Sequence, residues 1–313
     1  MPLVTSFQKV VIVTRKTQLE ELIEQHGTRD QAAFILQRRG QSINDVLDSH
    51  HRYSQSLAQL KAAIPSQVRQ QVIERQFLPN FLFGPHDLIM TLGQDGVVVN
   101  TAKYLQQQPI LAFNPDPGRI DGVLIPFKLD HVEDAVISAL SGKMPHKSIT
   151  LARAELEDGQ TLEAVNDLFI GIQSHASARY QIAFNQKKEE QSSSGIIVST
   201  GAGSTGWYRS ILTGAYGISQ NSRGALNFQD KYRFAVDARE LRFNVREPFI
   251  SQTSQANLIS GRITEKQSLE IVSRMPQHGI IFSDGMEADF LRFDSGMRAN
   301  IRIADRSVTM FWK

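Results

Sequence analysis

The hydrophobic pattern of the chain changes near Pro145, and this change limits the folds that the sequence can adopt. Before Pro145, short apolar runs alternate with helical patterns, which is typical of a mainly parallel sheet covered by helices. After Pro145, short apolar runs follow one another with few helical segments, which favours a sandwich of strands. We therefore predict a Rossmann-like α/β domain over residues 1–145 and an all-β sandwich domain over residues 146–313.

The predicted elements follow from this pattern. In the first domain, strands are expected at 10–13, 88–92, 110–113 and 123–125, with helices at 18–25, 29–38, 43–62, 97–105 and 132–140. In the second, strands are expected at 149–156, 164–172, 179–184, 196–199, 241–245, 269–272, 280–283, 290–293, 299–303 and 308–312. The charged run at 187–190 is interpreted as a hairpin loop.

Composition excludes several classes of function. The formal net charge is +2 with both signs interspersed, so the sequence has no basic stripe of the kind that binds nucleic acid. There are no cysteines, and no apolar run approaches the ~20 residues that a membrane helix needs. The eight histidines lack metal-ligand spacing. We expect a cytoplasmic protein that binds neither nucleic acid nor membrane and has no protein-bound metal.

A turn rich in glycine follows the apolar run at 88–92. It consists of Gly93, Gln94, Asp95 and Gly96 and leads into the predicted helix at 97–105. Glycines permit close approach of a ligand, and N–H groups at a helix start attract anions. The turn therefore predicts that Gly93, Gln94 and Gly96 contact a phosphate donor and that Asp95 lies beside the transferred phosphate. An ordinary turn aspartate is the alternative interpretation.

Two further segments carry groups suited to a nucleotide. Asn166 and Asp167 pair an amide with a carboxylate, a combination that binds ribose hydroxyls, although the residues alone favour a polar strand end. The glycine-rich segment 201–207 precedes a helix that is predicted to begin at Ser204 or Thr205 and to run toward Gly214. The N–H groups at the start of this helix favour anions.

The order and spacing of these segments resemble the NAD kinase family, and most closely its mitochondrial-type branch. The matching landmarks cover most of the chain and lie at 93–97, 114–119, 162–171, 193–195, 199–207, 246–248 and 283–285. Three positions depart from the family's pattern. Gln94 replaces a glycine, Val97 replaces a threonine, and Asp167 replaces a glutamate.

The resemblance implies an ATP-dependent NAD kinase with its site between the two domains. Such an enzyme transfers the γ-phosphate of ATP, bound with Mg²⁺, to the adenosine 2′-hydroxyl of NAD and so forms NADP. Asp95 would accept the proton of that hydroxyl. The family's NAD-binding positions correspond to Asn166, Asp167, Ser204, Thr205, Gly206 and Trp207. A homodimer or homotetramer is implied as well.

The departures leave other functions open. A side chain at Gln94 can crowd the phosphates, and loss of the threonine hydroxyl removes a hydrogen bond worth about 1.5–3 kcal/mol. A noncatalytic NAD(P)-binding protein and a related sugar or lipid kinase are therefore the alternatives. The residues do not distinguish ATP from polyphosphate as donor, or NAD from NADH as acceptor.

Overall fold

The chain folds into two compact units. The structure is a computed structural model that describes residues 7–220 and 232–313, apart from the side chains of 287 and 288. The first unit contains Met1–Lys147 and Val308–Lys313, and the second contains Ser148–Ser307. The chain passes between the units twice, first at residue 147 and again within the last strand.

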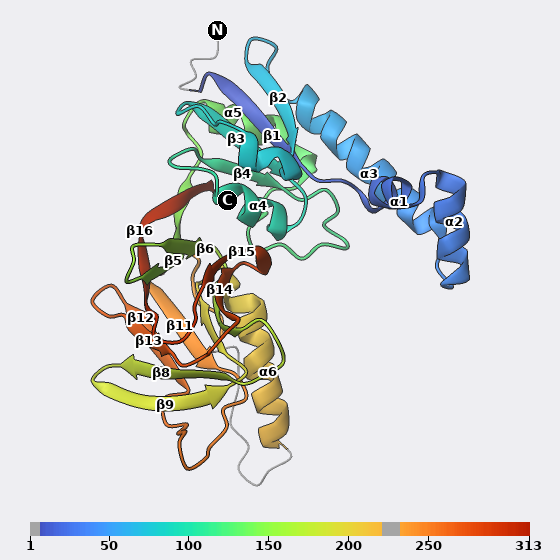
Figure 1. Cartoon of the computed structure of the whole chain (residues 1–313). Helices are drawn as coiled ribbons and strands as arrows, with labels where there is room; N and C mark the ends of the chain where they lie inside the picture. Colours follow the sequence, from blue (N-terminus) through green and yellow to red (C-terminus); the bar gives the residue numbers. More distant parts are fainter. Residues whose placement is uncertain (1–6, 221–231) are drawn as a thin grey trace. The chain divides into compact units, whose positions relative to one another are not determined.

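The first unit is built on a parallel sheet. Its strands lie in the order β2, β1, β3, β4, followed by the end of β16, and every neighbouring pair is parallel (Figure 1). Their bounds are Lys9–Thr14 (β1), Arg69–Glu74 (β2), Asp87–Leu92 (β3), Ile110–Phe113 (β4) and Arg298–Phe311 (β16). The residues that follow β1, β3 and β4 therefore lie along one edge of the sheet, where open α/β sheets bind ligands.

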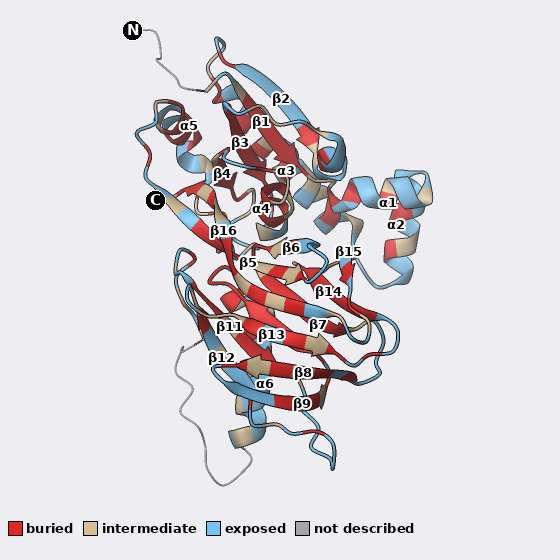
Figure 2. Ribbon diagram, turned by 60° about the vertical axis from the view of Figure 1, so that its left-hand side comes forward, coloured by how far each residue is buried: buried red, intermediate tan, exposed pale blue. Residues whose placement is uncertain are grey.

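Helices α3 (Ile43–Ala62), α4 (Asp95–Ala102) and α5 (Val132–Leu140) pack against this sheet, with short 3₁₀ turns η1 (Arg75–Asn80) and η2 (Leu129–His131). Helices α1 (Gln18–His26) and α2 (Arg29–Arg38) pack on each other and on α3 and form a separate apolar cluster away from the sheet (Figure 1). Residues of α3 and α5 form one core with alternate residues of β1 and β3, such as Ile12 and Met90. The intervening residues Val11 and Ile89 are equally buried, so both faces of these strands are covered (Figure 2).

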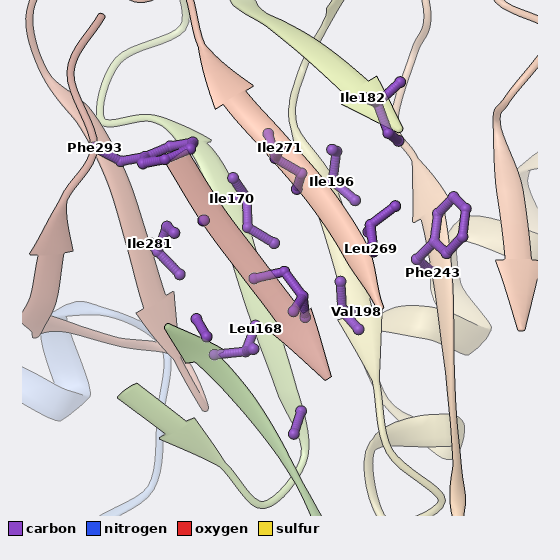
Figure 3. Packing of buried hydrophobic residues seen from close by; sticks show 14 of the residues in the cluster. Leu168, Ile170, Ile182, Ile196, Val198, Phe243, Leu269, Ile271, Ile281 and Phe293 are labelled. Atoms are coloured by element: carbon purple, nitrogen blue, oxygen red, sulfur yellow. The ribbon is translucent and has the colours of Figure 1, made fainter. Parts of the chain in front are cut away.

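The second unit is a sandwich of two antiparallel sheets. One contains β8 (Ala178–Phe184), β9 (Lys187–Ser193), β13 (Leu269–Ser273) and most of β16, with β5 (His146–Leu156) and β6 (Thr161–Ala164) beside β16. The other has the order β12, β11, β10, β7, β14, β15. Their bounds are Asp167–Ile172 (β7), Ile196–Ser199 (β10), Glu240–Val245 (β11), Ser260–Thr264 (β12), Gly279–Ser283 (β14) and Met286–Arg292 (β15). Buried side chains from both sheets form one core (Figure 3).

A helix covers the outer face of the second sheet. Phe169, Phe282 and their buried neighbours point away from the sandwich core and pack against Trp207 and Ile211 of α6 (Trp207–Gln220). A 3₁₀ turn, η3 (Gly203–Thr205), precedes this helix. The predicted fold class, an α/β domain joined to an all-β sandwich, is confirmed. Among the described residues, no helix has both the length and the apolar character that crossing a bilayer requires.

Several predicted elements differ from those observed. Residues 123–125 form no strand, because the N–H groups of Val123 and Leu124 donate to the carboxylate of Asp95 instead. The runs at 299–303 and 308–312 belong to one strand, β16. Residues 308–313 were expected in the second domain but belong to the first unit, where Met310 pairs with Ile110.

The charged run at 187–190 is the start of strand β9 and not a hairpin loop. Its Glu189 is buried and accepts hydrogen bonds from the N–H groups of Asn257 and Leu258 at 3.0 and 2.8 Å. The turn itself consists of Asn185 and Gln186, and Phe184 pairs with Lys187 across it. This charged run can lie in a strand because the buried carboxylate of Glu189 is hydrogen-bonded by these N–H groups.

We expect Gln186→Gly to stabilise the protein by about 1 kcal/mol. The φ angles of Asn185 and Gln186 are 49° and 65°, and left-handed backbone costs a residue with a Cβ about 1–2 kcal/mol. Denaturant titration of the variant measures the gain. Asn185→Gly is the matched control and should gain less, because the Asn185 amide accepts a 2.7 Å hydrogen bond from Gln267. A less stable Gln186→Gly variant would contradict the argument.

Candidate functional site

Asp95 lies at the first turn of α4, directly beyond the end of β3. Its two carboxylate oxygens accept hydrogen bonds from the N–H groups of Leu124 and Val123, each at 3.0 Å. Burial raises the pKa of Asp95, and the two N–H donors lower it, with burial the larger effect. The site therefore holds an oriented carboxylate whose affinity for a proton is increased, which is a property of a general base.

The φ angles and the space around each residue show which positions in the turn around Asp95 require glycine. Gly93 has φ +150°, and a Cβ placed on it would lie 2.7 Å from a methyl group of Val97. Gln94 has φ −82° and is exposed, so a side chain is accommodated there without left-handed strain. Gly96 has open space around it. Val97 is buried against Gly93 and thus fills the position of the family's threonine with a packing contact.

In the second unit, Asp284 organises the residues around Asn166 and Asp167. Its carboxylate accepts hydrogen bonds from the N–H groups of Val165 at 3.1 Å, Asn166 at 2.7 Å and Asp167 at 3.4 Å. In return the N–H of Asp284 donates to the carbonyl of Asp167 at 3.0 Å. Asp284 itself occupies the turn between β14 and β15 with φ 56°. One acidic side chain therefore fixes three successive backbone groups.

Asp167 is the second acid of this cluster. Its residue is buried, and among the described residues no donor is bonded to its carboxylate. Burial, followed by repulsion from the Asp284 carboxylate, raises the pKa of Asp167 to about 7. Two carboxylates in one place favour protonation of the one that lacks donors. Asp167 can thus exchange a proton near neutral pH, whereas Asp284 is held by its N–H donors.

The glycine-rich segment approaches the same place. A Cβ on Gly203 would lie 2.1 Å from the carbonyl oxygen of Asn166, so only glycine permits this approach. The N–H of Thr200 donates to that same carbonyl at 2.9 Å. The structure therefore brings together Asn166, Asp167, Asp284 and the start of α6, all within the second unit.

The four predicted residues of this segment differ in their surroundings. Ser204 is fully buried, and its hydroxyl donates to the carbonyl of Gly201 at 2.7 Å. Thr205 is half-buried and Gly206 is exposed. The Trp207 ring stacks on Phe169 with centroids 5.6 Å apart and planes inclined by 4°. The helix begins at Trp207 and not at the predicted Ser204 or Thr205, and it continues past Gly214 through Gln220, the last residue described before the gap at 221–231.

The Trp207 ring has a cationic neighbour as well. The guanidinium group of Arg246 lies 5.1 Å from the centroid of its ring. Trp207 therefore packs against Phe169 and Arg246, and its ring belongs to the cluster between α6 and the sheet.

The described residues hold no group of three His, Asp or Glu side chains placed to bind a metal ion. Mg²⁺ commonly binds through substrate phosphates and only one or two carboxylates. Asp95 fits that pattern, because each of its oxygens accepts one N–H and retains a lone pair. The residues present are thus compatible with a Mg²⁺ ion that arrives bound to phosphates.

Comparisons with known proteins give a fold but no match in sequence. No family model and no curated protein matches the chain. Among solved structures, yeast NADH kinase complexed with NADH superposes with a TM-score of 0.63 at 14% identity, over 100% of this chain and 88% of that one. The chain has the fold of the NAD kinases.

A second solved structure agrees. An NAD kinase from Archaeoglobus fulgidus in complex with ATP superposes with a TM-score of 0.57 at 14% identity, over 97% of this chain and 93% of that one. The two superpositions cover 100% and 97% of this chain, so the likeness in fold extends over both units.

The sequence prediction missed residues that hold the acids in place. Asp284 was noted only as part of the landmark at 283–285, and Val123 was expected in a strand. An Asp-Gly pair between two apolar runs signals a turn, but no sequence signal reveals that its carboxylate bonds residues 118 positions away. Conversely, Ser204 was predicted to bind NAD, and its hydroxyl already has an internal partner.

We expect Asp284→Ala to destabilise the protein by about 3 kcal/mol, since hydrogen bonds to a charged acceptor contribute about 1.5–3 kcal/mol each and are not additive. Denaturant titration provides the measurement. Asp158→Ala is the control, because the fully exposed Asp158 bonds only the neighbouring Gln160 among the described residues, and its removal should leave stability nearly unchanged. Equal effects of the two substitutions would contradict the role of Asp284.

The raised pKa of Asp167 predicts a pH-dependent stability. The carboxyl binds its proton more tightly in the folded protein, at about 7, than in the unfolded chain, at about 3.9. The Asp167 carboxyl therefore lowers the free energy of unfolding progressively as the pH rises from about 4 to about 7. Asp167→Asn should be more stable than the wild type at pH 8, by on the order of 4 kcal/mol, with little difference near pH 4. Denaturant titrations at both pH values test this, and a gain independent of pH would refute it.

Proposed function

We propose that this protein is an ATP-dependent NAD kinase, which transfers the γ-phosphate of ATP to the adenosine 2′-hydroxyl of NAD to form NADP. The observation that carries the proposal is the oriented, proton-binding carboxylate of Asp95 at the carboxyl edge of a parallel sheet in the NAD kinase fold. The neighbouring turn supplies glycine-flanked N–H groups at the start of α4, which suit phosphate oxygens.

The proposed step conserves atoms and charge. The ribose 2′-oxygen forms a bond to the γ-phosphorus while the bond from that phosphorus to the bridging oxygen breaks and ADP leaves. Asp95 takes the hydroxyl proton, a transfer favoured by its raised pKa. General base catalysis of this kind contributes on the order of 10²–10⁴-fold. When bound with ATP, Mg²⁺ would neutralise the charge that develops on the phosphates.

The acceptor is proposed to bind in the second unit. Asp167 and Asn166 lie at a turn held by Asp284, and Asp167 has a carboxylate that no described residue satisfies. A ribose diol is a suitable partner for such a group because each hydroxyl donates one hydrogen bond.

We extend the proposal to the branch of the family and to the number of subunits. Gln94 has φ −82° and Val97 lies within α4, so the two departures impose no backbone strain on the turn. The motif at 246–248 and the tryptophan at 207 place the chain nearest the mitochondrial-type branch by resemblance. A homodimer or homotetramer is proposed on the same ground, and light scattering of the purified protein tests it.

We expect Asp95→Asn to lower kcat for NADP formation at least about 100-fold, since the amide cannot accept the proton. Its affinity for NAD should remain near that of the wild type. An enzyme-coupled assay with NAD, ATP and Mg²⁺ measures turnover, and circular dichroism checks the fold. Asp121→Asn, which removes an exposed charge beside the Val123 loop, is the control. Unchanged turnover of Asp95→Asn would remove this residue from the mechanism.

Asp167 should act mainly on binding. Because its hydrogen bonds to ribose exist before and during the reaction, Asp167→Ala should raise KM for NAD more than it lowers kcat. Calorimetry should show NAD binding weakened by about 1.5–3 kcal/mol. If the wild type binds NAD in an Asp167-dependent manner and no donor yields NADP, the protein is a noncatalytic NAD(P)-binding protein. If it binds no NAD, a sugar or lipid kinase is the function to test.

A further inference from the structure

Arg15 has a buried nitrogen without a partner. Its Nε–H is buried and donates no hydrogen bond, and its guanidinium forms no ion pair with the described residues. Leaving a buried donor unsatisfied is costly, and native proteins keep few such groups. Arg15 therefore has the capacity to bind an anion that the chain itself does not supply.

The backbone of Arg15 is firmly held. Its N–H donates to the hydroxyl of Tyr53 at 3.1 Å, and that hydroxyl donates to the carbonyl of Leu92 at 3.1 Å. Burial raises the pKa of Tyr53 to about 12, so the phenol keeps its proton and the link persists at all physiological pH values. The end of β1 is thereby tied to the end of β3.

This position is beside the proposed phosphate turn. Arg15 follows β1 as Gly93 follows β3, and the two strands are parallel neighbours. A Cβ on Gly93 would lie 3.7 Å from Cδ of Arg15. The side chain of Arg15 therefore contacts the turn that contains Asp95.

Arg52, at the same carboxyl edge of the sheet, also has a buried nitrogen without a hydrogen-bond acceptor. Nε of Arg52 bonds the carboxylate of Asp116 at 3.1 Å, whereas its Nη2 is buried without a partner. Arg52 precedes Tyr53 in α3, and Asp116 follows β4. Two guanidinium groups with unsatisfied N–H donors thus belong to the carboxyl edge of one sheet, although only Arg15 lacks a counter-charge.

We propose that Arg15 binds the triphosphate group of the phosphate donor. The inference rests on the proposed function and names the residue that recognises its donor. A triphosphate carries several negative charges and many acceptor oxygens, and guanidinium groups bind phosphate through charge-assisted hydrogen bonds. The ligand can be ATP or an inorganic polyphosphate, because both present the same group to Arg15.

Calorimetry with two probes tests the proposal and separates the two sources. Wild-type protein is titrated with ATP and with inorganic tripolyphosphate, each with Mg²⁺. We expect Arg15→Gln to bind both probes about 10- to 150-fold more weakly, and Arg15→Lys, which keeps the charge, to lose less. Tighter binding of ATP than of tripolyphosphate identifies the nucleotide as donor, and equal affinities identify a site that recognises phosphates alone.

Lys16→Gln is the matched control. It removes the same charge one residue away, but Lys16 already pairs with Glu24 at 2.7 Å. Affinity for both probes should change by less than about threefold in this variant. An equal loss in Lys16→Gln and Arg15→Gln would overturn the proposal, as would unchanged binding by a folded Arg15→Gln variant or no binding of either probe to the wild type.

The binding test of Arg15 and the assay for NADP formation can fail independently of each other. If the wild type binds ATP in an Arg15-dependent manner but forms no NADP from NAD, the Arg15 site is established and the proposed reaction is wrong. If NADP forms and Arg15→Gln has an unchanged KM for ATP, the reaction stands and the Arg15 proposal is wrong.

Discussion

The second unit depends on one interaction, the binding of three successive N–H groups by the carboxylate of Asp284. A carboxylate removed from water is costly unless donors surround it, and residues Val165 to Asp167 provide them. The turn between β14 and β15 is thereby joined to the start of β7, 117 residues earlier at Asp167. Burial, and after it the nearby carboxylate of Asp284, raises the pKa of Asp167 to about 7.

In the first unit, Asp95 is likewise a carboxylate bound by backbone N–H groups. Two N–H groups stabilise its charge, yet burial has the larger effect and raises its pKa. These N–H groups belong to Val123 and Leu124, which the sequence pattern predicted to lie in a strand. In a strand they would have paired with a neighbouring strand and not with Asp95. In both units, backbone donors orient an acid and therefore leave the acid's position insensitive to side-chain substitution around it. Variation at Gln94 and Val97 is compatible with this arrangement.

How far the sequence predicts this protein depends on the range of the interactions involved. The strand at 88–92 and the helix at 43–62 have strong local periodicity, and both are confirmed. The edge strand β2 was missed because its exposed Arg69, Gln70 and Gln71 show no alternation. Glu189 was expected in a loop because the donors that satisfy it lie 68 and 69 residues away. The acids at 95 and 167 were found by motif, whereas their partners could be found only in three dimensions.

The last residues of the chain have a consequence for synthesis. Phe311 belongs to the core formed by α3, α5 and the first strands, and Met310 pairs with Ile110. A ribosome therefore releases β1 to α5, and then the whole second unit, before the final strand of the first sheet exists. During that interval β4 has an unpaired edge and the core lacks an aromatic ring. Slow translation near residue 307 would prolong this state, in which an unpaired strand edge favours association with other chains.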